Sequence, residues 1–137
     1  MTRYLLDTNI ISHLFRNPGG VIDASLRERA GEEIGTSLVV KAEILYGLEK
    51  HGALRAARHL ERLLDAITVW PIEEPTERCY ARLRAETERG GNPLGTNDLW
   101  IAAQSVALDA VVVTDDRAFL RVPGLKIENW LRPEGAA

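Results

Sequence analysis

Short apolar runs alternate with longer amphipathic segments along most of the chain. The runs expected to form strands lie at residues 3–6, 33–36, 68–70, 111–114 and 125–129. Apolar residues at helical spacing lie between them, at residues 9–15, 21–30, 37–47, 54–67, 75–88 and 99–108. Strands that are joined through helices need crossover connections, which are typical of parallel sheets. The alternation therefore predicts an α/β fold with a central, mostly parallel sheet of about four to five strands and helices on both faces.

Capping residues and helix breakers mark the ends of these segments. Ser37 is expected to cap the helix over residues 37–47, and Thr96, Asn97 and Asp98 are expected to cap the helix that begins at Leu99. Glycine, proline and asparagine interrupt the chain at residues 17–20 and 90–95. Such clusters are typical of loops.

Length and composition are those of one ordinary globular domain. The chain has 137 residues, of which 45% are hydrophobic and 27% are charged. The longest uncharged apolar stretch, at residues 99–108, is too short to span a bilayer. Asp7 interrupts what would have to be the apolar part of a signal peptide. We therefore expect a single domain over residues 1–137, in the cytoplasm and without a membrane anchor.

Cysteine and histidine give little support for a structural metal or a disulfide. Cys79 is the only cysteine, so it cannot form an internal disulfide, and its position suits the buried side of a helix. His13, His51 and His59 have no partner at metal-ligand spacing, which disfavours zinc. The net charge of −3 argues against nucleic-acid binding by bulk electrostatics alone. It does not exclude a nuclease whose acidic site is neutralised by cations.

Four acidic residues stand in apolar or capping contexts rather than on open charged faces. They are Asp7, Glu43, Asp98 and Asp116. Asp7 could simply cap the helix that follows it, and Asp98 could complement a helix dipole. Asp116 could cap the short turn that follows it, and Asp115 could be the active residue in its place.

Glu43 also has a simpler interpretation than a functional one. It could be a surface residue paired with Lys41 or Lys50. Its neighbours Ile44 and Leu45 indicate a buried setting instead.

Two of the acidic positions are expected to meet at one edge of the sheet. Asp7 follows the strand at residues 3–6, and Asp115 and Asp116 follow the strand at residues 111–114. Ligands of parallel sheets gather beyond the carboxyl ends of the strands. Carboxylates brought together there would repel one another unless protonated or bridged by cations, and Mg²⁺ or Mn²⁺ suits such oxygen ligands. The pattern predicts metal-dependent hydrolysis of a phosphodiester.

Five segments, in order along the chain, form a pattern shared with a known family. They are Leu5-Leu6-Asp7-Thr8-Asn9-Ile10-Ile11-Ser12, Ala42-Glu43-Ile44-Leu45-Tyr46-Gly47-Leu48-Glu49-Lys50, Asn97-Asp98-Leu99-Trp100-Ile101-Ala102-Ala103, Val112-Val113-Thr114-Asp115-Asp116 with Phe119, and Arg121-Val122-Pro123-Gly124-Leu125-Lys126-Ile127-Glu128-Asn129-Trp130. Together these segments resemble the PIN-domain ribonucleases and, within them, the VapC-type toxins of bacterial toxin–antitoxin pairs. The resemblance covers nearly the whole chain. It implies a three-layer PIN-like domain that cuts structured RNA, such as tRNA or rRNA, with Mg²⁺ or Mn²⁺. It also implies a homodimer and a VapB-like antitoxin.

The resemblance also implies roles for individual residues. Asp7, Asp98 and Asp116 look like metal carriers, and Glu43 looks like a ligand or a residue that orients the metal-bound water. The turn after Thr114 is slightly shorter than in many relatives, which leaves Asp115 as an alternative to Asp116. Positions that resemble supporting polar residues beside the acids are Thr8, Asn9, Asn97 and Thr114.

Arginines on two predicted helices are candidates for RNA contact. Arg55, Arg58 and Arg62 share one helical stripe, and Arg82 lies on the next helix with Arg78, Arg84 and Arg89. Alternatively, these arginines form a solvated face paired with neighbouring glutamates. Trp100 could stack on a base, although packing in the core or in a dimer is the simpler expectation.

Two other functions are consistent with parts of the pattern. A non-catalytic RNA- or protein-binding module on the same fold would use the acids only as caps. A phosphatase with Asp7 as nucleophile would need a second acid two residues later, where the chain has Asn9.

Overall fold

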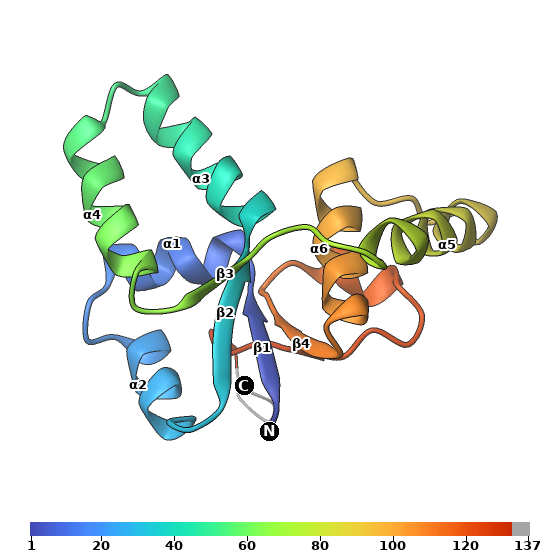
Figure 1. Ribbon diagram of the computed structural model, residues 1–137, viewed down its shortest axis with the longest axis horizontal. Helices are drawn as coiled ribbons and strands as arrows, with labels where there is room; N and C mark the ends of the chain where they lie inside the picture. Colours follow the sequence, from blue (N-terminus) through green and yellow to red (C-terminus); the bar gives the residue numbers. More distant parts are fainter. Residues whose placement is uncertain (133–137) are drawn as a thin grey trace.

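The computed structural model describes residues 1–132 and contains a parallel sheet with strand order β3-β2-β1-β4-β5 (Figure 1). The strands are β1 (Arg3–Leu6), β2 (Glu33–Ser37), β3 (Thr68–Trp70), β4 (Ala110–Val113) and β5 (Ile127–Glu128). All four neighbouring pairs are parallel. The predicted α/β fold with a parallel sheet of four to five strands is confirmed.

Helices connect the strands and cover the sheet. Within residues 1–132 they are α1 (Thr8–Arg16), α2 (Val21–Glu28), α3 (Leu38–Lys50), α4 (Leu54–Leu64), α5 (Thr76–Arg89) and α6 (Thr96–Ala107), with a 3₁₀ helix η1 (Arg117–Arg121). In Figure 1, α1 to α4 lie on one side of the strands, and α5 and α6 lie on the other. Helices on both sides of a sheet make the predicted three layers. None of the described helices is both long enough and apolar enough to cross a membrane.

The order of the strands reverses at β1. From β1 the chain adds β2 and β3 on one side, then returns to add β4 and β5 on the other. Leu6 is paired with Val113, so β1 and β4 end at the same level. The residues that follow these strands, Asp7 and Thr114, are therefore held at the point of reversal, where parallel sheets bind ligands.

The central strands are buried on both faces. Leu5 and Leu6 of β1 and Val112 and Val113 of β4 are each 0% exposed. This explains why β4 and the second half of β1 are continuous apolar runs rather than alternating ones. Ile10, also fully buried, anchors α1 directly after Asp7.

One of the two predicted helix caps is confirmed. The Ser37 hydroxyl accepts a hydrogen bond from Val39 N at 3.0 Å at the start of α3. The predicted cap at Thr96–Asp98 is wrong, because α6 begins at Thr96 and the extended Gly95 precedes it. Asp98 therefore belongs to the first turn of α6.

The side chains of Trp100 and Cys79 both have packing roles. Trp100 stacks on Tyr80, with ring centroids 4.1 Å apart and an interplanar angle of 19°. The packing interpretation of Trp100 is therefore confirmed. Cys79 is a free thiol, partly buried against the core, as expected.

Candidate active site

Asp7 lies directly after β1 and is 4% exposed. Its backbone N–H donates to Val113 O at 2.9 Å, which ties it to the end of β4. Its Oδ2 accepts hydrogen bonds from the Thr114 hydroxyl at 2.7 Å and from Asn9 Nδ2 at 3.3 Å. Asp7 occupies the N-cap position of α1, as the capping interpretation expected, but its side chain makes no capping hydrogen bond there.

The pKa of Asp7 is raised above its ordinary value. Burial is the main cause, because it disfavours the charged form. The hydrogen bond from Thr114 lowers the pKa, and the nearby charge of Asp116 raises it further. Within residues 1–132, Thr114 and Asn9 thus hold the carboxylate and no lysine or arginine pairs with it.

Glu43 lies on α3 and is partly buried. Its Oε1 is buried and has no hydrogen-bond partner within residues 1–132. Burial and the charge of Asp7 raise its pKa, while Asn97 and Thr8 lower it. Among the described residues it forms no ion pair with either lysine of α3, so the surface-pair interpretation is wrong.

Asp98 connects the acids electrostatically. Burial raises its pKa to about 6, and the charges of Asp7, Asp116 and Glu43 contribute in that order. Because each of these charges changes the pKa of another carboxylate in the set, the four carboxylates lie in one neighbourhood of the structure. We call Asp7, Glu43, Asp98 and Asp116 the acid cluster.

The structure distinguishes Asp116 from Asp115. Asp116 acts electrostatically on both Asp7 and Asp98, and its Oδ1 also caps η1 by accepting from Ala118 N at 2.9 Å. Asp115 turns away, and its Oδ1 accepts from Asn129 Nδ2 at 2.7 Å. Of the two, Asp116 is the member of the acid cluster.

Thr114 and Asn9 support the cluster through hydrogen bonds. The Thr114 hydroxyl accepts from Asp116 N at 3.0 Å while it donates to Asp7. Asn9 Oδ1 accepts from Asp115 N at 3.0 Å. These contacts place Thr114 and Asn9 where the sequence predicted supporting residues, and Thr8 and Asn97 lie beside Glu43.

The donor set of the acid cluster fits a divalent cation. Within residues 1–132, none of its four carboxylates pairs with lysine or arginine. Glu43 Oε1 is an unpartnered buried oxygen, and carboxylate oxygens are the ligands that Mg²⁺ and Mn²⁺ prefer. In the described part of the chain, no three acidic, histidine or cysteine side chains converge as a finished ligand set. Mutual repulsion of the carboxylates opposes such convergence.

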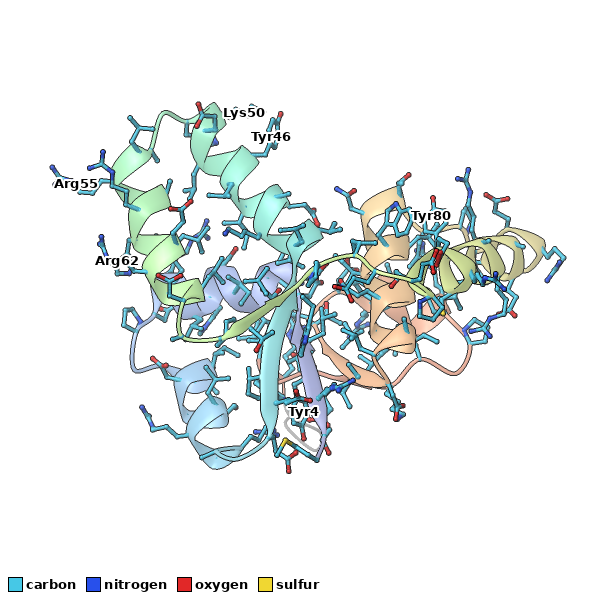
Figure 2. The ribbon with its side chains drawn as sticks, in the orientation of Figure 1. Tyr4, Tyr46, Lys50, Arg55, Arg62 and Tyr80 are labelled. Atoms are coloured by element: carbon cyan, nitrogen blue, oxygen red, sulfur yellow. The ribbon has the colours of Figure 1, made fainter. Side chains whose placement is uncertain are left out.

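The candidate arginines are separated in space. Arg55, Arg58 and Arg62 are exposed on α4, and none of them forms an ion pair with the described residues. Figure 2 shows Arg55 and Arg62 directed outward from α4. Arg82 lies on α5, at the opposite end of the molecule in Figure 1, so it does not share their surface.

The glutamate-paired face predicted as an alternative is largely wrong. Of the arginines on α4 and α5, Arg84 alone pairs within the described part of the chain, with Glu88 at 2.9 Å. The arginines of α4 therefore form no ion pairs with other described residues of the chain.

Asn129 is a neighbour of the site that the sequence did not single out. It follows β5 and reaches Asp115 in the turn after β4. Its place at the carboxyl end of a strand is the signal that could have identified it, since the acids follow strands at the same edge.

Comparison with known proteins agrees with this geometry. Residues 4–125 match the family model described as "PIN domain". The chain is 30% identical to Ribonuclease VapC2 of Haemophilus influenzae, with 96% of this chain and 100% of that protein covered. It is 33% identical to the tRNA(fMet)-specific endonuclease VapC of Shigella flexneri, with 95% and 99% covered.

Solved structures show the same likeness. The chain is similar to a chain in the crystal structure of VapBC2 from Rickettsia felis bound to a DNA fragment from their promoter, with a TM-score of 0.87, 30% identity, and 94% of this chain and 99% of that chain covered. The DNA-bound VapBC structure from Salmonella typhimurium gives a TM-score of 0.87 at 29% identity, with 95% and 99% covered. The chain therefore belongs to the PIN-domain family and, within it, to the VapC-type ribonucleases.

Proposed function

We propose that the protein is a Mg²⁺- or Mn²⁺-dependent endoribonuclease that hydrolyses phosphodiester bonds in structured RNA. One observation carries the proposal: Asp98 lies among three other carboxylates that no described cationic side chain balances, and burial together with these charges raises its pKa to about 6. A bound cation would relieve this repulsion.

Asp7, Glu43, Asp98 and Asp116 would hold the ion. When bound, Mg²⁺ or Mn²⁺ supplies Lewis-acid chemistry, which stabilises charge on a scissile phosphate and lowers the pKa of a water molecule. The chain itself contributes a prearranged carboxylate, because Thr114 and Asn9 fix the orientation of Asp7. Glu43 Oε1, which has no other described partner, is the atom available to orient the attacking water and accept its proton.

Metal removal tests the cofactor directly. Purified protein is incubated with structured RNA in Mg²⁺, in Mn²⁺ and in excess chelator, and cleavage is followed on denaturing gels. We expect cleavage with either metal and none with the chelator, and activity should return when the metal is restored. Metal-independent cleavage would contradict the proposed cofactor, and binding of RNA without cleavage in any condition would favour the non-catalytic module.

The relatives suggest where to look for a substrate. The Shigella flexneri relative is named a tRNA(fMet)-specific endonuclease. We infer that tRNA is a substrate class for this chain as well. Initiator tRNA, an elongator tRNA and ribosomal RNA in the same assay would show which is cleaved.

The exposed arginines of α4 are proposed to bind RNA phosphates. Replacing Arg55, Arg58 and Arg62 together by alanine is expected to raise KM and leave kcat nearly unchanged, because phosphate contacts position RNA but do no chemistry. The plot of log affinity against log salt should become shallower by about 0.7–0.9 for each phosphate that the variant no longer neutralises.

Filter binding at several salt concentrations measures this slope. Arg84→Ala is the matched control, because Arg84 is an exposed arginine already paired with Glu88. If the triple variant kept the wild-type slope, the phosphate-binding role of α4 would be excluded.

The proposed partners are a VapB-like antitoxin and a second copy of the chain. The solved structures of similar chains include VapBC assemblies. An acid cluster that pairs with no described lysine or arginine is a suitable target for an antitoxin arginine, which could pair with a carboxylate where the metal binds.

Two exposed apolar side chains on α3 bear on the second copy of the chain. Leu38 and Tyr46 are 47% and 67% exposed, and Figure 2 shows Tyr46 directed into solvent. These exposed apolar groups support a homodimer, and light scattering would measure its mass. We also propose that the protein acts in the cytoplasm.

A further inference from the structure

We infer that Asn129 is a positioning residue, which holds the turn after β4 so that Asp116 faces the other acids of the cluster and Asn9 stays aligned with Asp7. This inference rests on the proposed function. It assigns a role to the hydrogen bond between Asn129, which follows β5, and Asp115 in the turn after β4. The proposed metal chemistry does not itself involve this hydrogen bond.

Asn129 is held by its own hydrogen bonds. Its Oδ1 accepts from Leu131 N at 3.0 Å and from Arg132 N at 3.1 Å. Its Nδ2 is thereby directed at Asp115 Oδ1, to which it donates at 2.7 Å. The contact joins residues 14 positions apart, from the ends of neighbouring strands.

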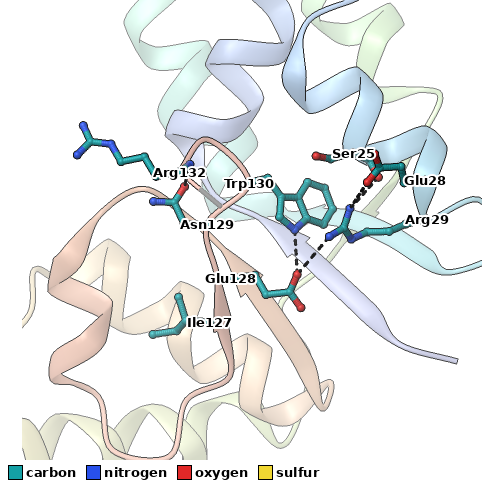
Figure 3. A pocket seen from close by; sticks show the side chains of 8 residues that line it. All are labelled: Ser25, Glu28, Arg29, Ile127, Glu128, Asn129, Trp130 and Arg132. Atoms are coloured by element: carbon teal, nitrogen blue, oxygen red, sulfur yellow. Dashed lines mark hydrogen bonds and ion pairs between the residues drawn. The ribbon is translucent and has the colours of Figure 1, made fainter. Parts of the chain in front are cut away.

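The next residue anchors Asn129 to the core. Trp130 is 3% exposed, and its ring lies 5.3 Å from the ring of Tyr4 on β1. The Arg29 guanidinium lies 4.3 Å from the centre of the Trp130 ring, and Trp130 Nε1 donates to Glu128 at 3.0 Å. Figure 3 shows Trp130 between Arg29 and the side that carries Asn129 and Arg132. Asn129 is therefore a rigid donor.

From Asp115 the contacts lead directly into the site. With its side chain held by Asn129, Asp115 donates its backbone N–H to Asn9 Oδ1 at 3.0 Å. Asn9 Nδ2 then donates to Asp7 Oδ2 and to Thr114 Oγ1, each at 3.3 Å. A continuous set of hydrogen bonds thus links Asn129 to Asp7.

The same anchor separates two consecutive aspartates. With Asp115 turned toward Asn129, the Asp116 N–H donates to Thr114 Oγ1 at 3.0 Å. The charge of Asp116 then acts on Asp7 and Asp98. If Asp115 were released, the turn could rotate, and either carboxylate could enter the acid cluster. Asn129 therefore determines which acid is presented.

Arg132 is a weaker partner of the same carboxylate. Its Nε lies 3.4 Å from Asp115 Oδ1, but its side chain is 71% exposed. Exposed ion pairs contribute little, because solvent screens the charge and the long side chain loses entropy. The directional contact is therefore the one from Asn129, and Arg132→Ala is a suitable control.

A charge swap tests the role. Asn129→Asp keeps the oxygen that accepts from Leu131 N and Arg132 N but replaces the donor with a second carboxylate, which repels Asp115. We expect kcat to fall about 10- to 100-fold, the range seen when partners of metal-binding residues are removed, with KM nearly unchanged. The double variant Asp115→Asn with Asn129→Asp restores one donor facing one acceptor, and kcat should recover.

A second readout separates positioning from folding. Hydrogen exchange of the Asp115 backbone amide, which donates to Asn9, should be slow in the wild type and the double variant and faster in Asn129→Asp. Arg132→Ala should match the wild type in both assays. Equal kcat in the wild type and in Asn129→Asp would overturn the inference, as would a double variant as slow as the single one.

The outcome remains distinguishable from failure of the proposed function. If the wild type cleaves RNA and Asp7→Asn does not, while Asn129→Asp is fully active, only the role of Asn129 is wrong. If Asp7→Asn is fully active, the proposed function is wrong. The exchange measurement still reports whether Asn129 holds the turn.

Discussion

An Asp7→Asn variant is expected to lose at least about 10³-fold in RNA cleavage, equivalent to about 4 kcal/mol of transition-state stabilisation. Asparagine keeps the shape of the side chain, and its oxygen can still accept from the Thr114 hydroxyl at the position of Oδ2. It removes the charge that the proposed metal requires. Because burial raises the pKa of Asp7, the neutral variant should fold at least as stably as the wild type.

The measurement is a cleavage time course together with a thermal melt of the same samples. Asp109→Asn is the matched control, because it makes the same chemical change in an exposed aspartate that precedes β4 and pairs with Lys126 at 2.6 Å. The control should cleave RNA at the wild-type rate. Near-normal cleavage by Asp7→Asn would remove Asp7 from the active site.

An Asp98→Asn variant is expected to be more stable than the wild type at pH 7 in metal-free buffer. The pKa of Asp98 rises from 3.8 to about 6 on folding, so between these pH values the folded protein binds more protons than the unfolded chain. Its contribution to the free energy of unfolding is therefore fully present below pH 4 and is lost as the pH rises through 6. Allowing for partial solvent screening, the charged form costs the fold about 1 kcal/mol.

Urea unfolding of both proteins at a series of pH values between 4 and 7.5 measures this contribution. The difference in free energy of unfolding between variant and wild type should grow as the pH rises and level off above pH 6. Saturating Mg²⁺ should reverse the order of stability at pH 7, because only the wild type keeps all four carboxylates. A difference that does not change with pH would contradict the raised pKa.

The fold was accessible from the sequence because its strongest signals are local. Val111, Val112 and Val113 form a short β-branched run that is typical of a strand buried on both faces, and all three are buried. The regular alternation of strands and helices then leaves few topologies, since crossover connections have one preferred hand. In a parallel sheet the ends of neighbouring strands share one edge, which is enough to bring Asp7 and Thr114 together.

The details of the site depend on contacts that local sequence does not encode. Asp115 and Asp116 are chemically identical neighbours, and they are distinguished by contacts with residues outside the dipeptide: Asp115 Oδ1 accepts from Asn129, whereas Asp116 Oδ1 accepts from Ala118 N. The sequence misplaces the start of α6 because Thr96, Asn97 and Asp98 are all good caps, whereas Gly95 takes that position. Glu43 could not be assigned from helical spacing alone, because its environment includes Asp7 and Asn97 from other elements.

The central position of β1 also bears on how the protein is synthesised. Asp7 is the first acid translated, yet the hydroxyl that orients it comes from Thr114, 107 residues later. At translation rates of about 5–20 residues per second, Thr114 is synthesised roughly 5–20 seconds after Asp7. A chain whose synthesis stops before β4 has the first carboxylate but lacks both the strand beside it and the hydroxyl that fixes it. We therefore expect chains that end before β4 to have no nuclease activity.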